Sequence, residues 1–140
     1  MARVKGKTMS VKKNLRGLSG VQFLDTALEL QTYTIRTCVK FPKRYTFYIS
    51  NNIVQSATNI HAFVKRGNSI FPTNADDARL RHEQFVFAVA ELQNLISQIN
   101  IAYDTFPIPD KKMIKWMELI KKEIALVKSA IKKDKERYKF

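Results

Sequence analysis

The chain has 140 residues, of which 45% are hydrophobic, and it carries a formal net charge of +13. This length and composition indicate one folded domain with its own core and exclude a disordered chain. The single cysteine excludes an internal disulfide and a cysteine-based metal cluster. No signal peptide is recognisable, and no apolar run is long enough to span a bilayer. We therefore expect a cytoplasmic protein that does not bind membranes.

The positive charge is concentrated at the two ends of the chain. Residues 1–20 carry six basic and no acidic side chains, and residues 110–140 carry eleven basic and five acidic ones. Blocks of this kind attract polyanions, and nucleic acid is the commonest polyanion in a cytosol. The alternative is a solvated lysine-rich surface that serves only solubility.

The N-terminal part divides into an arm and a first helix. Residues 1–18 have no hydrophobic period and are expected to form a flexible basic arm, whereas residues 19–140 form the folded unit. A helix is predicted at about residues 21–39, and Phe41-Pro42 ends it because the residue before proline disfavours the α conformation. Its predicted buried stripe consists of Leu24, Ala27, Leu28, Ile35, Cys38 and Val39.

A second helix is predicted at about residues 43–65, where apolar residues again recur at steps of three and four. Gly67-Asn68 follows and is a typical C-cap signal. The polar run between Asn51 and Asn59 fits an oligomer interface or an RNA surface better than a core. The predicted apolar face consists of Ile49, Ile53, Ala57, Ile60 and Val64.

A third helix is predicted at about residues 75–104. Asn74 can cap it, and Asp76 and Asp77 lie in its first turn, where the helix dipole favours acidic side chains. This account of the two aspartates is preferred to a catalytic pair. The predicted buried stripe consists of Phe85, Ala88, Val89, Leu92, Ile96, Ile99 and Tyr103.

The fourth helix, predicted at about residues 110–138, has two distinct faces. One carries apolar residues at helical spacing, and the other carries lysines at the same spacing. Four amphipathic helices joined by short loops predict an all-α fold, an antiparallel up-down-up-down four-helix bundle. The apolar set is Met113, Met117, Ile120, Ile124, Val127 and Ile131, and the cationic set is Lys121, Lys128, Lys132, Lys135 and Lys139.

Residues that could support catalysis or bind metal are few. His61 and His82 have no ligand-type partner at helical spacing, and Cys38 has no visible base. No phosphate-binding loop or nucleophile motif occurs. We therefore expect neither an enzyme nor a metal or other cofactor. A small bundle enzyme using His61 or His82 is a contrasting hypothesis, which bound metal or cofactor in the purified protein would support.

The basic residues give a candidate nucleic-acid surface. Those at the end of the second helix and the start of the third share one end of a bundle, where arginines suit bidentate contact to phosphate. No aromatic platform for reading bases is visible, so binding would be salt-sensitive and weakly sequence-selective. The candidate residues are Lys43, Arg44, Lys65, Arg66, Arg79, Arg81, Lys121, Lys128, Lys132, Lys135 and Lys139.

Several short segments between residues 21 and 133 match one small family. The segments are Phe41-Pro42-Lys43-Arg44-Tyr45-Thr46, Arg79-Leu80 leading into Ala90-Glu91-Leu92, Ala102-Tyr103-Asp104, and a closing helix with Trp116, Ile120 and Lys132-Lys133. In these features the chain resembles the accessory variability determinant (Avd) proteins of diversity-generating retroelements. That family is related to the four-helix-bundle proteins encoded by intervening sequences in bacterial 23S ribosomal RNA genes.

The resemblance implies a function beyond what the residues alone indicate. Avd-like proteins are non-enzymatic, form a homopentameric ring-shaped barrel, and bind nucleic acid and the element's reverse transcriptase. With that polymerase they support mutagenic cDNA synthesis from template-repeat RNA. The candidate basic positions carry over from this resemblance. The alternative is a ribosomal-RNA-associated bundle of the intervening-sequence type, which shares the fold without a polymerase partner.

Overall fold

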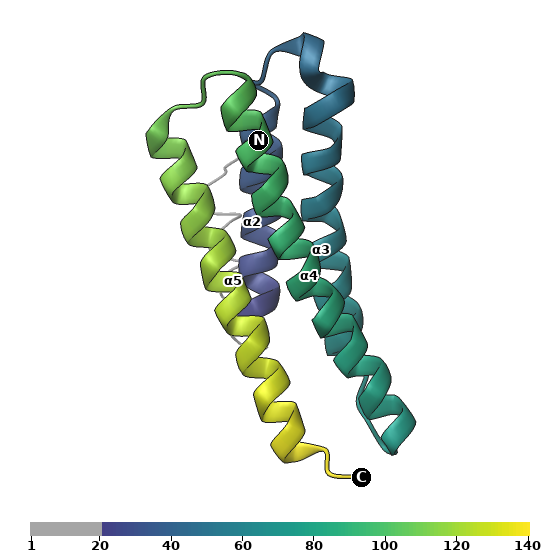
Figure 1. Ribbon diagram of the computed structural model, residues 1–140. Coiled ribbons are helices and arrows are strands. Elements are labelled where there is room, and N and C mark those ends of the chain that lie inside the picture. Colours follow the sequence, from purple (N-terminus) through teal and green to yellow (C-terminus); the bar gives the residue numbers. More distant parts are fainter. Residues whose placement is uncertain (1–20) are drawn as a thin grey trace, which may run out of the picture.

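The structure, a computed structural model, describes residues 21–140, so the predicted arm at residues 1–18 lies outside the described residues. Four long α-helices and no strand occur in the described part, which confirms the all-α class (Figure 1). These helices are α2 (Gln22–Cys38), α3 (Asn51–Ser69), α4 (Ala75–Thr105) and α5 (Asp110–Arg137).

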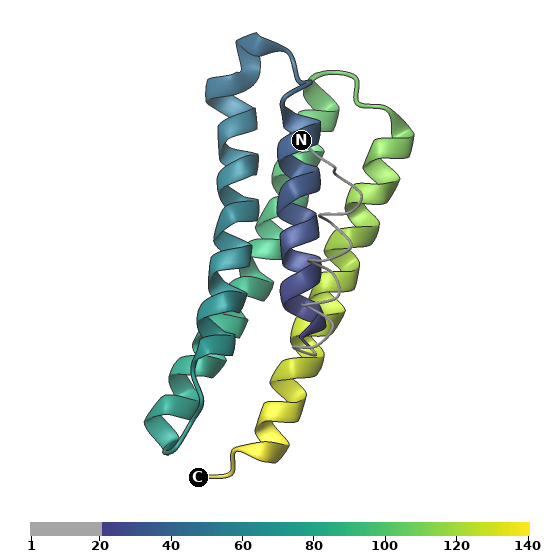
Figure 2. The same cartoon turned by 180° about the vertical axis from the view of Figure 1, so that it is seen from behind.

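The helices pack side by side around a shared interior. α3 and α5 each contact both α2 and α4. The α2–α3 and α4–α5 connections lie at one end of the molecule, and the α3–α4 connection lies at the other end, together with the C-terminus (Figures 1 and 2). This arrangement places the end of α3, the start of α4 and the end of α5 close together.

The segment before α3 is less regular than the single helix predicted from residue 43. It consists of a 3-10 turn at Lys43–Tyr45 and a π turn at Thr46–Ser50, after which α3 begins. Tyr45 stacks on Phe106 with the ring centroids 5.1 Å apart, and Phe41 meets the edge of the same ring at 4.7 Å. These rings close the end of the core where α2–α3 and α4–α5 connect.

The predicted C-cap at Gly67-Asn68 is wrong, because α3 continues through both residues to Ser69. Gly67 is buried within the helix, and a Cβ atom added there would lie 2.6 Å from a ring carbon of Phe85 on α4. Glycine is therefore used at this position for close helix approach and not for a turn.

The buried stripe of α2 is rotated relative to the prediction. Ile35 and Val39 are 41% and 64% exposed, whereas Leu30 and Thr34 are fully buried. Thr34 accepts a hydrogen bond of 2.9 Å from Nε1 of Trp116 on α5. This bond satisfies the indole N–H inside the core, so a polar residue lies where an apolar one is expected.

In α4 and α5 the predicted core is correct in part. Leu92 and Ile120 are fully buried, as predicted. In α4, however, Leu95 is buried instead of Ile96, and Tyr103 is 45% exposed. In α5, Trp116, Leu119 and Glu123 are buried, and the predicted Met113, Met117, Ile124 and Ile131 only pack against the core from its edge.

α4 is also apolar on its outer side. Val86, Phe87 and Ile101 are 42%, 48% and 58% exposed. By length and composition alone α4 is long and apolar enough to cross a membrane, as core helices of soluble proteins also can be. The expectation that no apolar run is long enough to span a bilayer is therefore wrong for this helix. The apolar residues on the outer side raise the hydropathy of α4 above that of an ordinary amphipathic helix, which is polar on the side away from the core.

Candidate nucleic-acid interface

The outer surface of α5 is lined by lysines. The helix has no internal glycine or proline, and its core-facing residues fix which side points outward. Lys121, Lys128, Lys132 and Lys135 are all exposed at spacings of seven, four and three residues, so they lie along one side of α5. We call these four the first lysine row. Lys139, predicted to belong with them, is exposed but follows the end of the helix.

A second set of lysines lies on a different side of α5. Its members recur at spacings of four, seven and eleven residues and are exposed. The ammonium of Lys115 lies 5.6 Å from the ring centroid of Tyr33, so this side faces toward α2. This second lysine row is not among the predicted residues, although the same helical period places its members on one side of the helix. It consists of Lys111, Lys115, Lys122 and Lys133.

Within residues 21–140, no lysine of either row forms an ion pair with an acidic side chain. Within residues 21–140 the ion pairs are Arg79–Asp76 at 3.4 Å and Arg81–Asp134 at 2.7 Å, and neither includes a lysine of the rows. The positive charge of α5 is therefore available to an external polyanion.

Arg81 has a structural position and does not fit its predicted role as a phosphate contact. It is only 7% exposed, and its Nε donates to Asp134 on α5 at 2.7 Å. Its Nη1 donates to the carbonyls of Gly67 and Ile70, at 3.2 and 3.0 Å. Arg81 thus joins the ends of α3, α4 and α5. Its partner lies 53 residues away, so no local pattern in the sequence indicates this contact.

Three other predicted basic residues, Lys43, Arg44 and Arg79, are exposed but lie at opposite ends of the molecule. Lys43 and Arg44 lie in the turn before α3, with Arg44 above the ring of Tyr45 at 5.0 Å. Arg79 lies near the start of α4, at the other end, and pairs with Asp76 one turn earlier. The structure therefore does not bring all predicted residues into one surface.

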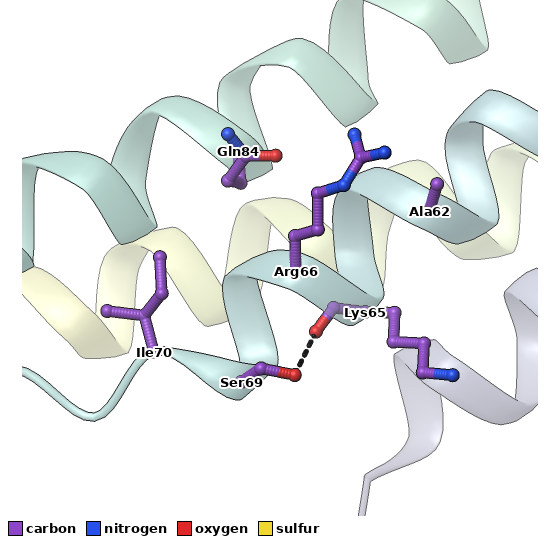
Figure 3. Close-up of a pocket in the computed structure, with 6 residues that line it drawn as sticks. All are labelled: Ala62, Lys65, Arg66, Ser69, Ile70 and Gln84. Atoms are coloured by element: carbon purple, nitrogen blue, oxygen red, sulfur yellow. Dashed lines mark hydrogen bonds between the residues drawn. The ribbon is translucent and has the colours of Figure 1, made fainter.

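Lys65 and Arg66 lie together beside a pocket of about 500 Å³ between the end of α3 and the start of α4 (Figure 3). We call it the α3–α4 pocket. Its surface is mostly apolar, and the Arg66 guanidinium lies 5.9 Å from the ring centroid of Phe63. The pocket is lined by Ala62, Lys65, Arg66, Ser69, Ile70 and Gln84.

The residues considered for catalysis occupy structural positions or stand alone. His61 Nδ1 donates to Oε1 of Gln31 at 2.8 Å, and burial, with a contribution from Lys65, lowers its pKa. Burial raises the pKa of the Cys38 thiol to about 12, so the reactive thiolate does not form at neutral pH. His82 is exposed, and among residues 21–140 no three potential ligand side chains gather to hold a metal ion.

One acidic side chain of α5 lies in the core, which the sequence does not predict. Glu123 is fully buried, and within the described part of the chain neither carboxylate oxygen has a hydrogen-bond partner. Burial raises its pKa to about 9, so the side chain is a neutral carboxylic acid at pH 7. Because Glu123 is neutral, it does not offset the lysine rows on the outside of the same helix.

Comparisons with known proteins add no relative, since no family model, curated protein or solved structure matches the chain significantly. The geometry of the described residues is therefore the only structural basis for assigning a function. It provides an outer cationic surface on α5 and a mixed apolar and cationic pocket at the end of α3.

Proposed function

We propose that the protein is a non-enzymatic, nucleic-acid-binding accessory protein of the Avd type. In this role it binds template RNA and the reverse transcriptase of a diversity-generating retroelement, and it supports mutagenic cDNA synthesis. The observation that carries the proposal is the first lysine row, whose exposed side chains have no acidic partner among residues 21–140. The resemblance of the sequence to the Avd family gives the proposal its specific setting.

The expected mechanism is electrostatic. Each lysine that meets a phosphate releases a condensed counterion, so affinity depends on salt more than on base sequence. Lys121 and Lys135 are separated by about 20 Å along the axis at 1.5 Å per residue, a distance that covers several phosphates of one strand. The contacts would therefore hold the backbone of an RNA and leave its bases free for a polymerase.

The proposed assembly is a ring-shaped homopentamer of antiparallel up-down-up-down bundles. The position of the connections at alternating ends supports the antiparallel topology (Figure 1). The outer apolar side of α4, with Val86 and Ile101, supplies a surface that assembly would cover. A ring would also multiply the charge of +13 per chain and strengthen RNA capture. Light scattering coupled to size exclusion in high salt, with nucleic acid removed, tests this by a mass near five protomers.

The central experiment compares two quadruple variants with equal changes in charge. In one, Lys121, Lys128, Lys132 and Lys135 are changed to glutamine. In the other, the matched control, all four lysines of the second lysine row are changed. Affinity for a fluorescent 20-nucleotide RNA is measured by anisotropy at several salt concentrations. We expect the first variant to lose about tenfold or more at low salt and to show a flatter salt dependence.

The control separates a defined interface from general attraction. We expect the second-row variant to retain a steeper salt dependence than the first-row variant, because its lysines contact fewer phosphates. Equal losses in the two variants would show that only the total charge matters. An unchanged salt dependence in the first-row variant would remove that row from the interface and refute the proposal in this form.

A further inference from the structure

The α3–α4 pocket combines properties that the lysine rows lack. Ala62 and Ile70 line it on opposite sides of the Arg66 side chain, and Lys65 lies next to Arg66 (Figure 3). Most of its accessible surface is apolar. Such a pocket accepts an apolar side chain and places cations where an acidic neighbour of that side chain would lie.

Further exposed apolar groups continue the surface away from the pocket. Phe71, which follows Ile70, is 77% exposed. On the other side, Phe63 contacts Phe87 of α4 with ring centroids 5.7 Å apart, and Phe87 is 48% exposed. Exposed aromatic side chains next to cationic ones are typical of a protein-binding site.

The chemistry favours an acidic protein over RNA at this position. The accessible surface of the pocket is mostly apolar, and the ring of Phe63 is in contact with both Phe87 and the guanidinium of Arg66. It does not present an open ring face on which a base could stack.

We propose that the α3–α4 pocket is the docking site for an acidic amphipathic segment of a protein partner. An apolar side chain of that segment enters the pocket beside Arg66, against Ala62 or Ile70, and flanking carboxylates pair with Lys65 and Arg66. This inference rests on the proposed function, in which the protein joins an RNA to a protein partner. It adds that the two ligands occupy different surfaces, the first lysine row on α5 and the pocket at the end of α3.

The test uses a fluorescein-labelled helical peptide of about 16 residues, with leucine at i, i+3, i+4 and i+7 and glutamate elsewhere. Binding to the full chain is measured by anisotropy at physiological salt. We expect Ala62→Trp, which fills the pocket without a change in charge, to weaken binding about tenfold or more. We expect Arg66→Glu to do the same, and the matched charge reversal Lys132→Glu on α5 to change affinity less than threefold.

Two control peptides and an RNA-binding measurement complete the experiment. Replacing glutamate by glutamine, or leucine by serine, should each reduce binding to the wild-type protein. RNA affinity should fall with Lys132→Glu and stay unchanged with Ala62→Trp. Circular dichroism confirms that each variant is folded.

The outcomes distinguish the two proposals. Equal peptide affinity for Ala62→Trp and wild type would overturn the docking site, as would a loss with Lys132→Glu as large as with Arg66→Glu. A loss of RNA affinity with Ala62→Trp, without a loss of peptide affinity, would assign the pocket to RNA and also overturn it. If the wild-type protein binds the peptide through the pocket but does not bind RNA, the docking site stands and the proposed function fails.

Discussion

α4 and α5 are similar in length, with 31 and 28 residues, but their outer sides differ. The outer side of α5 carries exposed lysines, whereas that of α4 carries Val86, Phe87 and Ile101. Their inner sides both contribute fully buried residues to the same core. The inner sides therefore account for the fold, and the difference between the outer sides indicates two kinds of contact, with a polyanion and with an apolar surface.

The largest expected effect is the loss of packing on the inner side of α4. Leu92 is fully buried, so Leu92→Ala should lower the free energy of unfolding by about 2–5 kcal/mol. The matched outer variant, Val86→Ala, should cost less than about 1 kcal/mol because Val86 is 42% exposed. Urea denaturation measures both. Similar costs would mean that the two sides of α4 are not distinct.

On the inner side of α5, the corresponding test is the pH dependence caused by Glu123. Its pKa in the folded protein, about 9, lies above the ordinary value of 4.5, so the folded state holds the proton more tightly. The free energy of unfolding should therefore fall as pH rises between these values, by about 1.4 kcal/mol per pH unit. Glu123→Gln should remove this slope.

Urea denaturation at pH 6, 7 and 8 provides the measurement for Glu123. Glu118→Gln is the matched control, because Glu118 is exposed on the same helix, and this variant should keep the wild-type slope. Over two pH units the wild-type protein should lose about 3 kcal/mol relative to Glu123→Gln. Parallel pH profiles for the two variants would show that Glu123 is ionised in the folded protein.

A smaller effect is expected where α3 approaches the inner side of α4. A methyl group at position 67 would lie 2.6 Å from a ring carbon of the buried Phe85. We expect Gly67→Ala to destabilise the protein by about 1–2 kcal/mol, because overpacking outweighs the gain in helix propensity. In a Phe85→Leu background the same change should become neutral or stabilising. Thermal unfolding of the four proteins measures this coupling.

The helical class and the centre of each core follow from local periodicity, which is why Leu92, Ile120 and Ile53 are buried as predicted. The errors have long-range causes. Thr34 is buried by its bond to Trp116, 82 residues away, and Arg81 by its pair with Asp134. Glycine stands at position 67 inside a helix because Phe85, 18 residues away, leaves no room for a Cβ atom there. None of these partners is close enough in sequence to contribute to a periodic pattern.

The same limit applies to the candidate site. The first lysine row could be predicted because its members share one helix, so their spacing alone places them together. The α3–α4 pocket could not, since it joins the end of α3, the following loop and Gln84 of α4. Lys65 and Arg66 are predicted to lie at this end of a bundle, but no pattern in the sequence indicates the apolar surface beside them.

The smallest effects on stability are expected on the outer sides of α4 and α5. Changes on α4 should affect the oligomer mass, and changes on α5 should affect RNA binding. Changing the exposed Val86 and Ile101 to serine should alter the free energy of unfolding by about 0.5 kcal/mol or less per residue. It should lower the mass found by light scattering and leave the RNA affinity of each chain unchanged at low salt. Changing the first lysine row to glutamine should preserve the mass and weaken RNA binding.

If the serine variant keeps its mass, the outer side of α4 does not form the oligomer interface. If the glutamine variant changes its mass, the lysines of α5 contribute to assembly, and the division between the two helices fails.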